Sequence, residues 1–507
     1  MAANLKSLAK DTAIYGMSSI IGRFLNYLLV PLYTAKLSAA SGGYGVITNL
    51  YSWTALLLVI LTYGMETTFF RYANKVGEHP ARVYSTTLCS VACTSVLFVV
   101  AVLGFLPMIS AKLGYGNHQS FVAVMAMVVA LDAFQAIPFA YLRYQKRPIK
   151  FAALKLVFIF LNVGLNLLYF VIFPAMRWNV LGLYDSHFTL DVGYAFYINL
   201  ACTGAVTFLF WKELTRVKWQ LDLALLKRML SYGWPILILG IAGILNQTAD
   251  KILFPYIYDG SAAQMKSQLG IYGAAAKIAM IMALITQAFR YAYEPFVFGK
   301  TKDKDNKETY AKAMKYFVIF TLLAFLAVMA WMGILRHIIA PDYWEGLKVV
   351  PIVMAAEIMM GIYFNLSFWY KLIDKTIWGA VFSFIGCAVL VIINVVFVPR
   401  YGYMACAWGG FAGYGTAMAL SYVVGQRYYP IAYPLKELLG YALVAGALFA
   451  AMVLVTLPGG TVIEVAYRTA LLAIFFVFML KREHLGGMLA KLPVIGHLFK
   501  PRASSSQ

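Results

Sequence analysis

Long apolar stretches recur along the whole chain, and they restrict its fold more than any other feature. Fourteen windows between charged or Gly/Pro-rich breaks approach or exceed the roughly 20 apolar residues that a bilayer-spanning helix needs. Their approximate limits are 12–37, 44–69, 83–109, 120–143, 150–174, 189–211, 231–257, 269–296, 313–335, 348–370, 376–398, 402–425, 437–457 and 462–480. The sequence therefore predicts an all-α polytopic membrane protein with about 14 transmembrane helices.

The overall composition agrees with this prediction. The chain is 62% hydrophobic and 12% charged, whereas soluble domains are about 45–50% apolar and about 25% charged. A soluble enzyme, a disordered chain and a nucleic-acid-binding domain are excluded on this ground, despite the formal net charge of +21.

Basic residues concentrate on alternate connections between the windows. If the N-terminus is cytoplasmic, the inside segments carry groups of Lys and Arg, and the outside segments carry singletons or pairs. Lys and Arg in short loops mark the cytoplasmic side, so we expect both termini to lie inside. The basic loops would favour anionic membrane lipids, which accounts for the positive charge without nucleic acid.

Similar features recur at one spacing. Pro31 and Gly45 are followed by Pro255 and Gly270 at offsets of 224 and 225, and Asn166 is followed by Asn394 at 228. Two copies of a six-span unit, over residues 1–215 and 225–428, would explain this spacing. Parallel repeats of this kind occur in transporters that rock one half against the other around a midplane site.

The predicted organisation follows from the windows and the repeat. It comprises an N-lobe with six spans (1–215), a cytoplasmic linker (216–230), a C-lobe with six spans (231–428), two extra C-terminal spans (429–482) and a cytoplasmic tail (483–507).

Ionisable residues within the windows are the candidate functional residues, because a charge at membrane depth costs at least about 2.5–3.5 kcal/mol on insertion scales. The basic ones are Arg23, Lys155, Lys251, Lys277 and Arg290, and the acidic ones are Asp132, Asp250, Glu357 and, nearer a span end, Glu66. Asp250 and Lys251 are neighbours in sequence, so we expect them to point to different sides. Asp132 could pair with Lys155 or Arg23 across a helix interface.

Several cations around one cavity suit an anionic substrate, because guanidinium and ammonium groups make charge-assisted hydrogen bonds to phosphate oxygens. The carboxylates would then either balance the cations or bind a coupling H⁺ or Na⁺, and the residues leave both roles open. Asn26 and Asn166 could offer hydrogen bonds to sugars. No nucleotide-binding loop, metal-binding cluster or hydrolytic triad occurs in the sequence, which predicts neither an enzyme nor a cofactor.

Four stretches carry a likeness to a known family. They are Tyr15-Gly16 through Gly22-Arg23 and Pro31-Leu32 to Tyr44-Gly45; Tyr232-Gly233-Trp234-Pro235 through Asn246 to Asp250-Lys251; Leu269-Gly270-Ile271-Tyr272 with Pro295; and Asn394 to Pro399 with Gly402 and Ala405. Over roughly residues 5–480 the chain resembles Wzx-type oligosaccharide flippases of the polysaccharide transporter family, within the multidrug/oligosaccharidyl-lipid/polysaccharide (MOP) exporter superfamily.

The resemblance implies two six-helix lobes around a central cavity, with Arg23 at the family's basic first-span position and Arg290 as a basic residue on the eighth span. It further implies that an undecaprenyl-pyrophosphate-linked oligosaccharide is moved to the periplasmic leaflet of a bacterial inner membrane for surface polysaccharide or O-antigen synthesis. Glycosyltransferases or a polymerase of the same pathway would be partners.

Three alternatives stay open at this point. A lipid II flippase is disfavoured because Phe24-Leu25-Asn26-Tyr27 follows Arg23 without a further arginine. An ion-coupled exporter of small cations or drugs would be expected to have an acidic cavity. A membrane glycan polymerase or ligase would need larger outer loops than this chain has.

Overall fold

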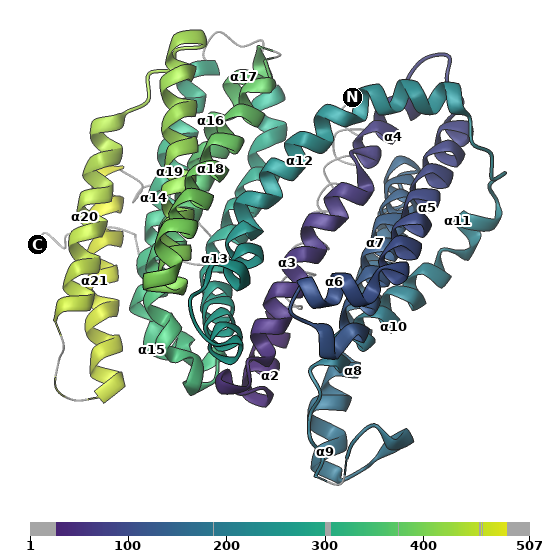
Figure 1. The fold of residues 1–507 in the computed structure, drawn as a ribbon. Helices are drawn as coiled ribbons and strands as arrows, with labels where there is room; N and C mark the ends of the chain where they lie inside the picture. The colour runs from purple at the N-terminus through teal and green to yellow at the C-terminus, as the bar shows by residue number, and fades with distance from the viewer. Residues whose placement is uncertain are drawn as a thin grey trace, which may run out of the picture. The chain divides into compact units, whose positions relative to one another are not determined.

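The structure is a computed structural model that describes residues 27–185, 187–299, 306–373, 375–455, 458 and 460–483. The regular secondary structure in these ranges is entirely helical, and Figure 1 shows long helices joined mostly by short connections. Contacts divide the described residues into two units. Unit 1 holds residues 27–284 with Ile338–Gly425, and unit 2 holds Ile285–His337 with the described residues from Gln426 onward.

Unit 1 contains most of the helices. These are α2 (Leu29–Lys36), η1 (Ala39–Ser41), α3 (Gly43–Thr62), α4 (Met65–Ala73), α5 (Pro80–Gly104), α6 (Leu106–Lys112), η2 (Gly116–His118), α7 (Gln119–Tyr144), α8 (Pro148–Leu167), η3 (Leu168–Ile172), α9 (Phe173–Met176), η4 (Val180–Gly182), α10 (Gly193–Leu209), α11 (Trp211–Thr215), α12 (Leu223–Ile257), the first part of α13 (Ala262–Gly299), η6 (Pro341–Val349), α16 (Val350–Leu366), α17 (Phe368–Leu372), α18 (Ile377–Tyr401) and most of α19 (Tyr403–Tyr428).

Unit 2 contains the remainder of α13 and α19 together with α14 (Asn306–Ala330), α15 (Met332–Leu335), the first two residues of η5 (Arg336–Ile338), α20 (Leu435–Leu454) and α21 (Gly460–Arg482). Within it, Lys315 of α14 is held by Glu437 of α20 at 2.6 Å and by Glu483 at 2.8 Å. This pair of ionic contacts fastens the two last helices to α14.

Eleven of the predicted spans are confirmed in the described residues. Eleven helices in the described ranges are long and apolar enough to cross a bilayer, and each overlaps a predicted window. The window at 189–211 corresponds to the shorter apolar helix α10, and that at 402–425 corresponds to the glycine-rich α19. Most of the first window, 12–37, lies outside the described residues. The chain is an all-helical, polytopic integral membrane protein.

Helix α12 is 35 residues long and begins at an N-cap. The Asp222 side chain accepts a hydrogen bond from the Leu225 amide at 3.0 Å and forms an ion pair with Arg82. The amide hydrogen bond and the neighbouring guanidinium hold the pKa of the Asp222 carboxyl below its usual value. The cap therefore stays ionised, which favours the helix N-terminus electrostatically.

The two ends of α12 contact different partners. Near its start, the Tyr72 hydroxyl of α4 donates to the Arg228 carbonyl at 2.9 Å. Further along, the Asn246 amide donates to the Ser383 carbonyl of α18 at 2.9 Å. Figure 1 shows α12 passing beside α3 on the way. The helix thus connects segments from both copies of the predicted repeat, while the division into two six-span lobes stays a prediction.

Asn166 of α8 is fully buried and makes several hydrogen bonds within the bundle. Its carbonyl oxygen accepts from the Tyr33 hydroxyl at 2.8 Å, and its amide donates to the Asn162 carbonyl at 2.7 Å. These bonds join α2 to α8 and satisfy an amide that would otherwise be buried without partners.

The Tyr33→Phe substitution is expected to lower stability by about 0.6–1.7 kcal/mol, which runs from the average to the largest value that double-mutant cycles give for hydrogen bonds between membrane helices. The physical reason is that the Asn166 carbonyl oxygen loses its donor while it stays buried. Thermal unfolding of the detergent-purified protein measures the effect. Tyr401→Phe, at an exposed tyrosine, is the matched control, and equal melting temperatures for the two variants would contradict the assignment.

Candidate functional site

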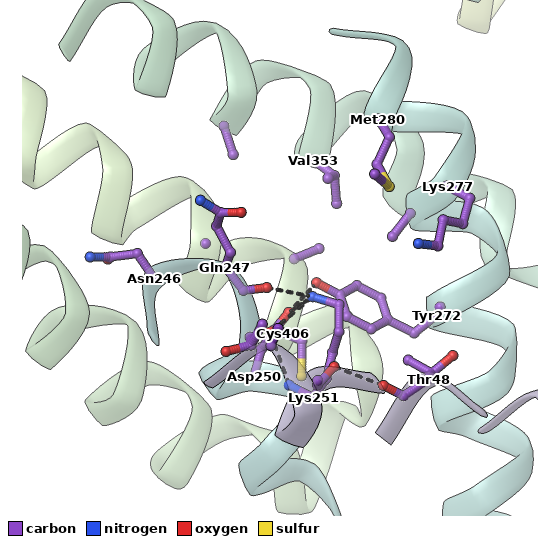
Figure 2. Close-up of a pocket in the computed structure, with 18 of the residues that line it drawn as sticks. Thr48, Asn246, Gln247, Asp250, Lys251, Tyr272, Lys277, Met280, Val353 and Cys406 are labelled. Carbon is purple, nitrogen blue, oxygen red and sulfur yellow. Dashed lines mark hydrogen bonds and ion pairs between the residues drawn. The ribbon is translucent and has the colours of Figure 1, made fainter. Parts of the chain in front are cut away.

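A cavity of about 410 Å³ lies within unit 1. Six helices contribute to its walls: α3, α12, α13, α16, α18 and α19. Its charged lining residues in the described part of the chain are Asp250 and Lys251 on α12, Lys277 on α13 and Glu357 on α16. Four of the sequence-predicted site residues, from three helices, therefore share one cavity. Figure 2 shows three of them, Asp250, Lys251 and Lys277.

Small residues let α3 and α13 approach very closely beside this cavity. A Cβ atom on Gly45 would lie 1.9 Å from the Lys266 carbonyl oxygen, and one on Gly270 would lie 2.9 Å from the Gly45 nitrogen. We call Gly45, Lys266 and Gly270 the glycine junction. The two glycines that share an offset in the predicted repeat thus meet in the fold, as close packing of membrane helices through small residues requires.

Further contacts hold the same end of unit 1 together. The Tyr343 hydroxyl of η6 donates to the Leu37 carbonyl at 2.6 Å, and the Ala39 amide donates to the Asp342 carboxylate at 2.6 Å. The rings of Tyr44 and Tyr343 pack edge to face with centroids 6.0 Å apart. Segments from the two predicted repeat copies are therefore joined directly at this end, next to the cavity residue Tyr44.

Asp250 and Lys251 form an ion pair instead of pointing to different sides, which corrects the expectation from their adjacency. The Lys251 ammonium lies 2.9 Å from one Asp250 oxygen and 3.0 Å from the other, and it also donates to the Gln247 carbonyl at 3.0 Å. The lysine side chain is long enough to fold back along the helix. The Tyr272 hydroxyl donates to the same carboxylate at 2.6 Å, which links α12 to α13.

Lys277 and Glu357 are the two remaining charged groups of the cavity. Among the residues that the structure describes, neither has a hydrogen-bond or ion-pair partner in reach of its charged atoms. In Figure 2, Lys277 reaches into the cavity from α13, while Gln247 and Lys251 extend from α12. We expect water in the cavity to solvate both groups, because a charged side chain without a partner is energetically costly inside a membrane helix bundle.

The charge of the described cavity lining differs from the expected cation-rich chamber. Two lysines face two carboxylates, so the formal charges of these four residues sum to zero. One pair is already joined through Asp250 and Lys251. Sequence reasoning singled out these ionisable residues and gave charge balance as one of two roles for the carboxylates, but it expected an excess of cations that the described lining does not have.

The other predicted charges on described residues of the N-terminal half are not among the residues that line this cavity. Glu66 of α4 forms an ion pair with Arg143 of α7. The charge of Asp132 on α7 interacts with that of Lys155 on α8, and the Lys155 ammonium also lies 4.0 Å from the centre of the Phe139 ring. The Glu66 carboxylate is thus neutralised by Arg143, and Asn166 is likewise held within the bundle.

Three predicted site residues cannot be placed at the cavity. Arg23 and Asn26 lie outside the described residues. Arg290 lies on the part of α13 that belongs to unit 2, beyond the last cavity-lining residue of that helix. Their predicted roles in substrate binding stay predictions.

Two tyrosines of the site were not among the candidates that the sequence analysis chose for their charge. Tyr272 anchors Asp250, and the Tyr414 hydroxyl of α19 donates to the Asn246 carbonyl at 3.1 Å. In the sequence, Tyr272 stood out only as part of the stretch Leu269-Gly270-Ile271-Tyr272 that carries the family resemblance, because an uncharged tyrosine in an apolar span is not conspicuous. No group of three or more His, Cys, Asp or Glu residues in the described ranges is arranged to hold a metal ion.

Comparison with known proteins identifies the family. A family model described as "Polysaccharide biosynthesis protein" matches residues 8–290, which is more than half of the chain. The chain belongs to this family. No curated protein sequence matches it.

Solved structures with the same fold include transporters. The lipid II flippase MurJ in an inward closed conformation has 16% identity and a TM-score of 0.70, covering 92% of this chain and 99% of that one. An inward-facing multidrug resistance MATE family transporter of the MOP superfamily has 12% identity and a TM-score of 0.62, covering 82% and 95%. The MATE multidrug transporter DinF-BH has 16% identity and a TM-score of 0.57, covering 82% and 95%. This member of the polysaccharide biosynthesis family therefore has the fold of MOP superfamily transporters.

The Gly45→Ala substitution is expected to separate α3 from α13 at the glycine junction, because the new Cβ would overlap a backbone carbonyl that cannot move aside alone. Cys406 lines the cavity and is buried, so the reactivity of its thiol measures how far separation of α3 from α13 opens the cavity to solvent. In a variant that keeps only this cysteine, we expect Gly45→Ala to raise its rate of modification by a membrane-impermeant thiol reagent.

The matched control for this experiment is Gly164→Ala on α8, where a new Cβ meets nothing within 4 Å. Modification of Cys406 at the same rate in Gly45→Ala and in the control would show that the junction does not restrict access.

The Asp250→Asn substitution is expected to destabilise the protein by about 3 kcal/mol, because it leaves the Lys251 ammonium without its counter-ion at membrane depth. The double variant Asp250→Asn/Lys251→Gln removes both charges and should recover most of that loss. Melting temperatures of the single and double variants test this. A double variant at least as unstable as the single one would contradict the ion-pair assignment.

Proposed function

We propose that this protein is a flippase that moves a lipid-pyrophosphate-linked oligosaccharide across a bacterial inner membrane by alternating access. The observation that most supports the proposal is the cavity. It is lined by Lys277, whose ammonium group has no ion-pair partner among the described residues, and its volume is about 410 Å³. Membership of the polysaccharide biosynthesis family and a fold shared with transporters support it. O-antigen or a related surface polysaccharide would be the product that uses this step.

The chemistry of the cavity fits a diphosphate headgroup. An ammonium binds phosphate oxygens as a point charge, and the low dielectric of the bundle strengthens that attraction relative to water. Because Lys251 is already engaged by Asp250, Lys277 is the described lysine that is available to a ligand. Arg23 would add a second cation if it lies where the family resemblance implies.

The glycine junction supports a mechanism with alternating access. Contacts at Gly45 and Gly270 hold one end of the cavity against opening, and they join segments of the two predicted repeat copies through packing of small residues. Such contacts can separate without breaking a covalent or ionic link. In the orientation predicted from the basic loops, this is the periplasmic end of the cavity.

A cation or drug exporter is the second candidate, and the two cavity carboxylates favour it. Glu357 could attract a cationic compound, and DinF-BH, which shares the fold, is a multidrug transporter. Efflux of a cationic dye from vesicles that contain the protein would support this candidate. Lipid II is a third cargo, since MurJ shares the fold. Coupling to H⁺ or Na⁺ is compatible with each candidate. The residues predicted for coupling or charge balance are Asp132, Asp250, Glu357 and Glu66.

The Lys277→Gln substitution is expected to lower the export of lipid-linked oligosaccharide at least tenfold, because loss of a charge-assisted contact of about 1.5–3 kcal/mol corresponds to that factor. The measurement is the appearance of surface glycan in cells that depend on this protein, normalised to its amount in the membrane.

The matched control is Lys227→Gln, which removes an exposed lysine from α12 that does not line the cavity. We expect it to export at the wild-type rate. Undiminished export by Lys277→Gln would contradict a role for this cavity in binding the headgroup.

A further inference from the structure

The polar side chains around the cavity fall into two groups: uncharged side chains that hydrogen-bond within the protein, and two charged side chains without an ion-pair partner among the described residues. This difference suggests how the cargo is recognised. Most uncharged donors are already used within the protein: the Tyr272 and Tyr414 hydroxyls donate to α12, and the Thr48 hydroxyl donates to the Tyr44 carbonyl at 2.8 Å. The Asn246 amide donates to the Ala242 and Ser383 carbonyls. The donors of these groups are therefore used within the wall, whereas the Asn246 side-chain oxygen has no hydrogen-bond partner among the described residues.

The charged groups left over have opposite chemistry. The Lys277 ammonium only donates hydrogen bonds, and the Glu357 carboxylate, when ionised, only accepts them. They come from different helices, α13 and α16. Neither finds an ion-pair partner within the described ranges, even though each lines the same cavity.

A purely anionic ligand would not account for Glu357. A diphosphate close to Lys277 would be repelled by a second negative charge in the same low-dielectric space, so a carboxylate at this site suits a part of the cargo that donates hydrogen bonds. The sugars of a lipid-linked oligosaccharide supply such a partner, because their hydroxyl and amide groups donate hydrogen bonds. A carboxylate can accept two such bonds at once, one on each oxygen.

We propose that Glu357 is a specificity-determining residue that binds the sugar next to the diphosphate, while Lys277 binds the diphosphate itself. This inference rests on the proposed function and refines it, because it assigns the two ends of the cargo headgroup to two walls of the cavity. Gln247 of α12, which lines the same cavity and is exposed, provides an amide for further sugar contacts.

Binding of the diphosphate by Lys277 and of the sugar by Glu357 would make the cavity selective for the glycosylated lipid over undecaprenyl diphosphate without a glycan. A site that contained only cations would also bind undecaprenyl diphosphate that carries no glycan. With Glu357 ionised in the wall, the bare diphosphate meets repulsion that sugar hydrogen bonds would offset. The carboxylate therefore disfavours transport of the carrier before the glycan has been attached.

Two lipids separate the diphosphate contribution from the sugar contribution. The purified full-length protein is titrated with undecaprenyl diphosphate and with undecaprenyl diphosphate that bears one N-acetylglucosamine. We expect the wild type to bind the glycosylated lipid at least tenfold more tightly, the factor that a charged hydrogen bond supplies. Glu357→Gln should bring the ratio of the two dissociation constants close to one.

Control variants make the outcomes distinguishable. Glu464→Gln on α21, outside the cavity lining, should keep the wild-type ratio. Lys277→Gln should weaken binding of both lipids by a similar factor and leave their ratio unchanged. If neither lipid binds to the wild type, the proposed flippase function fails.

If both lipids bind the wild type equally, or if Glu357→Gln keeps the preference for the glycosylated lipid, the sugar assignment is overturned while the flippase proposal stands. A retained preference together with an altered pH dependence of transport would assign Glu357 to proton coupling instead.

Discussion

The free energy needed to take a charge out of water governs where the ionisable residues of these helices lie. Within the described spans, Glu66 is paired with Arg143, and Asp250 is paired with Lys251. Lys277 and Glu357 lack such partners there, and both line a cavity. Charged groups that form ion pairs within the bundle stabilise the packing of the helices. Charged groups that line a cavity without a partner are the places where a polar cargo can replace water.

A second constraint is the close approach of helices through small residues. Gly45 and Gly270 bring α3 and α13 so near that an added methyl group would overlap the neighbouring backbone. Packing of this kind depends on shape and involves no charge, so it can form and separate at low cost. The charged cavity lies directly beside it, and a change at the junction would therefore change access to Lys277 and its surroundings.

Much of the fold was predictable from the sequence, because apolar stretches long enough to cross a bilayer have few alternatives to helices. The offset between Gly45 and Gly270 also suggested a repeat, although sequence spacing gave no sign that these glycines touch. The site was predictable only in part. Adjacency suggested that Asp250 and Lys251 diverge, but a flexible lysine side chain folds back to its neighbour. Asn166 was predicted to bind sugars, but its side chain is already hydrogen-bonded to Tyr33 and Asn162. The sequence did not reveal this, because contacts between helices depend on three-dimensional packing.

The account depends on a diphosphate occupying the cavity beside Lys277. The most direct measurement is an electron cryomicroscopy structure of the protein with undecaprenyl-diphosphate-linked oligosaccharide bound. The account predicts density for the diphosphate within hydrogen-bond distance of the Lys277 ammonium, with the first sugar on the side of Glu357. Diphosphate density at another surface of the protein, with this cavity left to water, would contradict it.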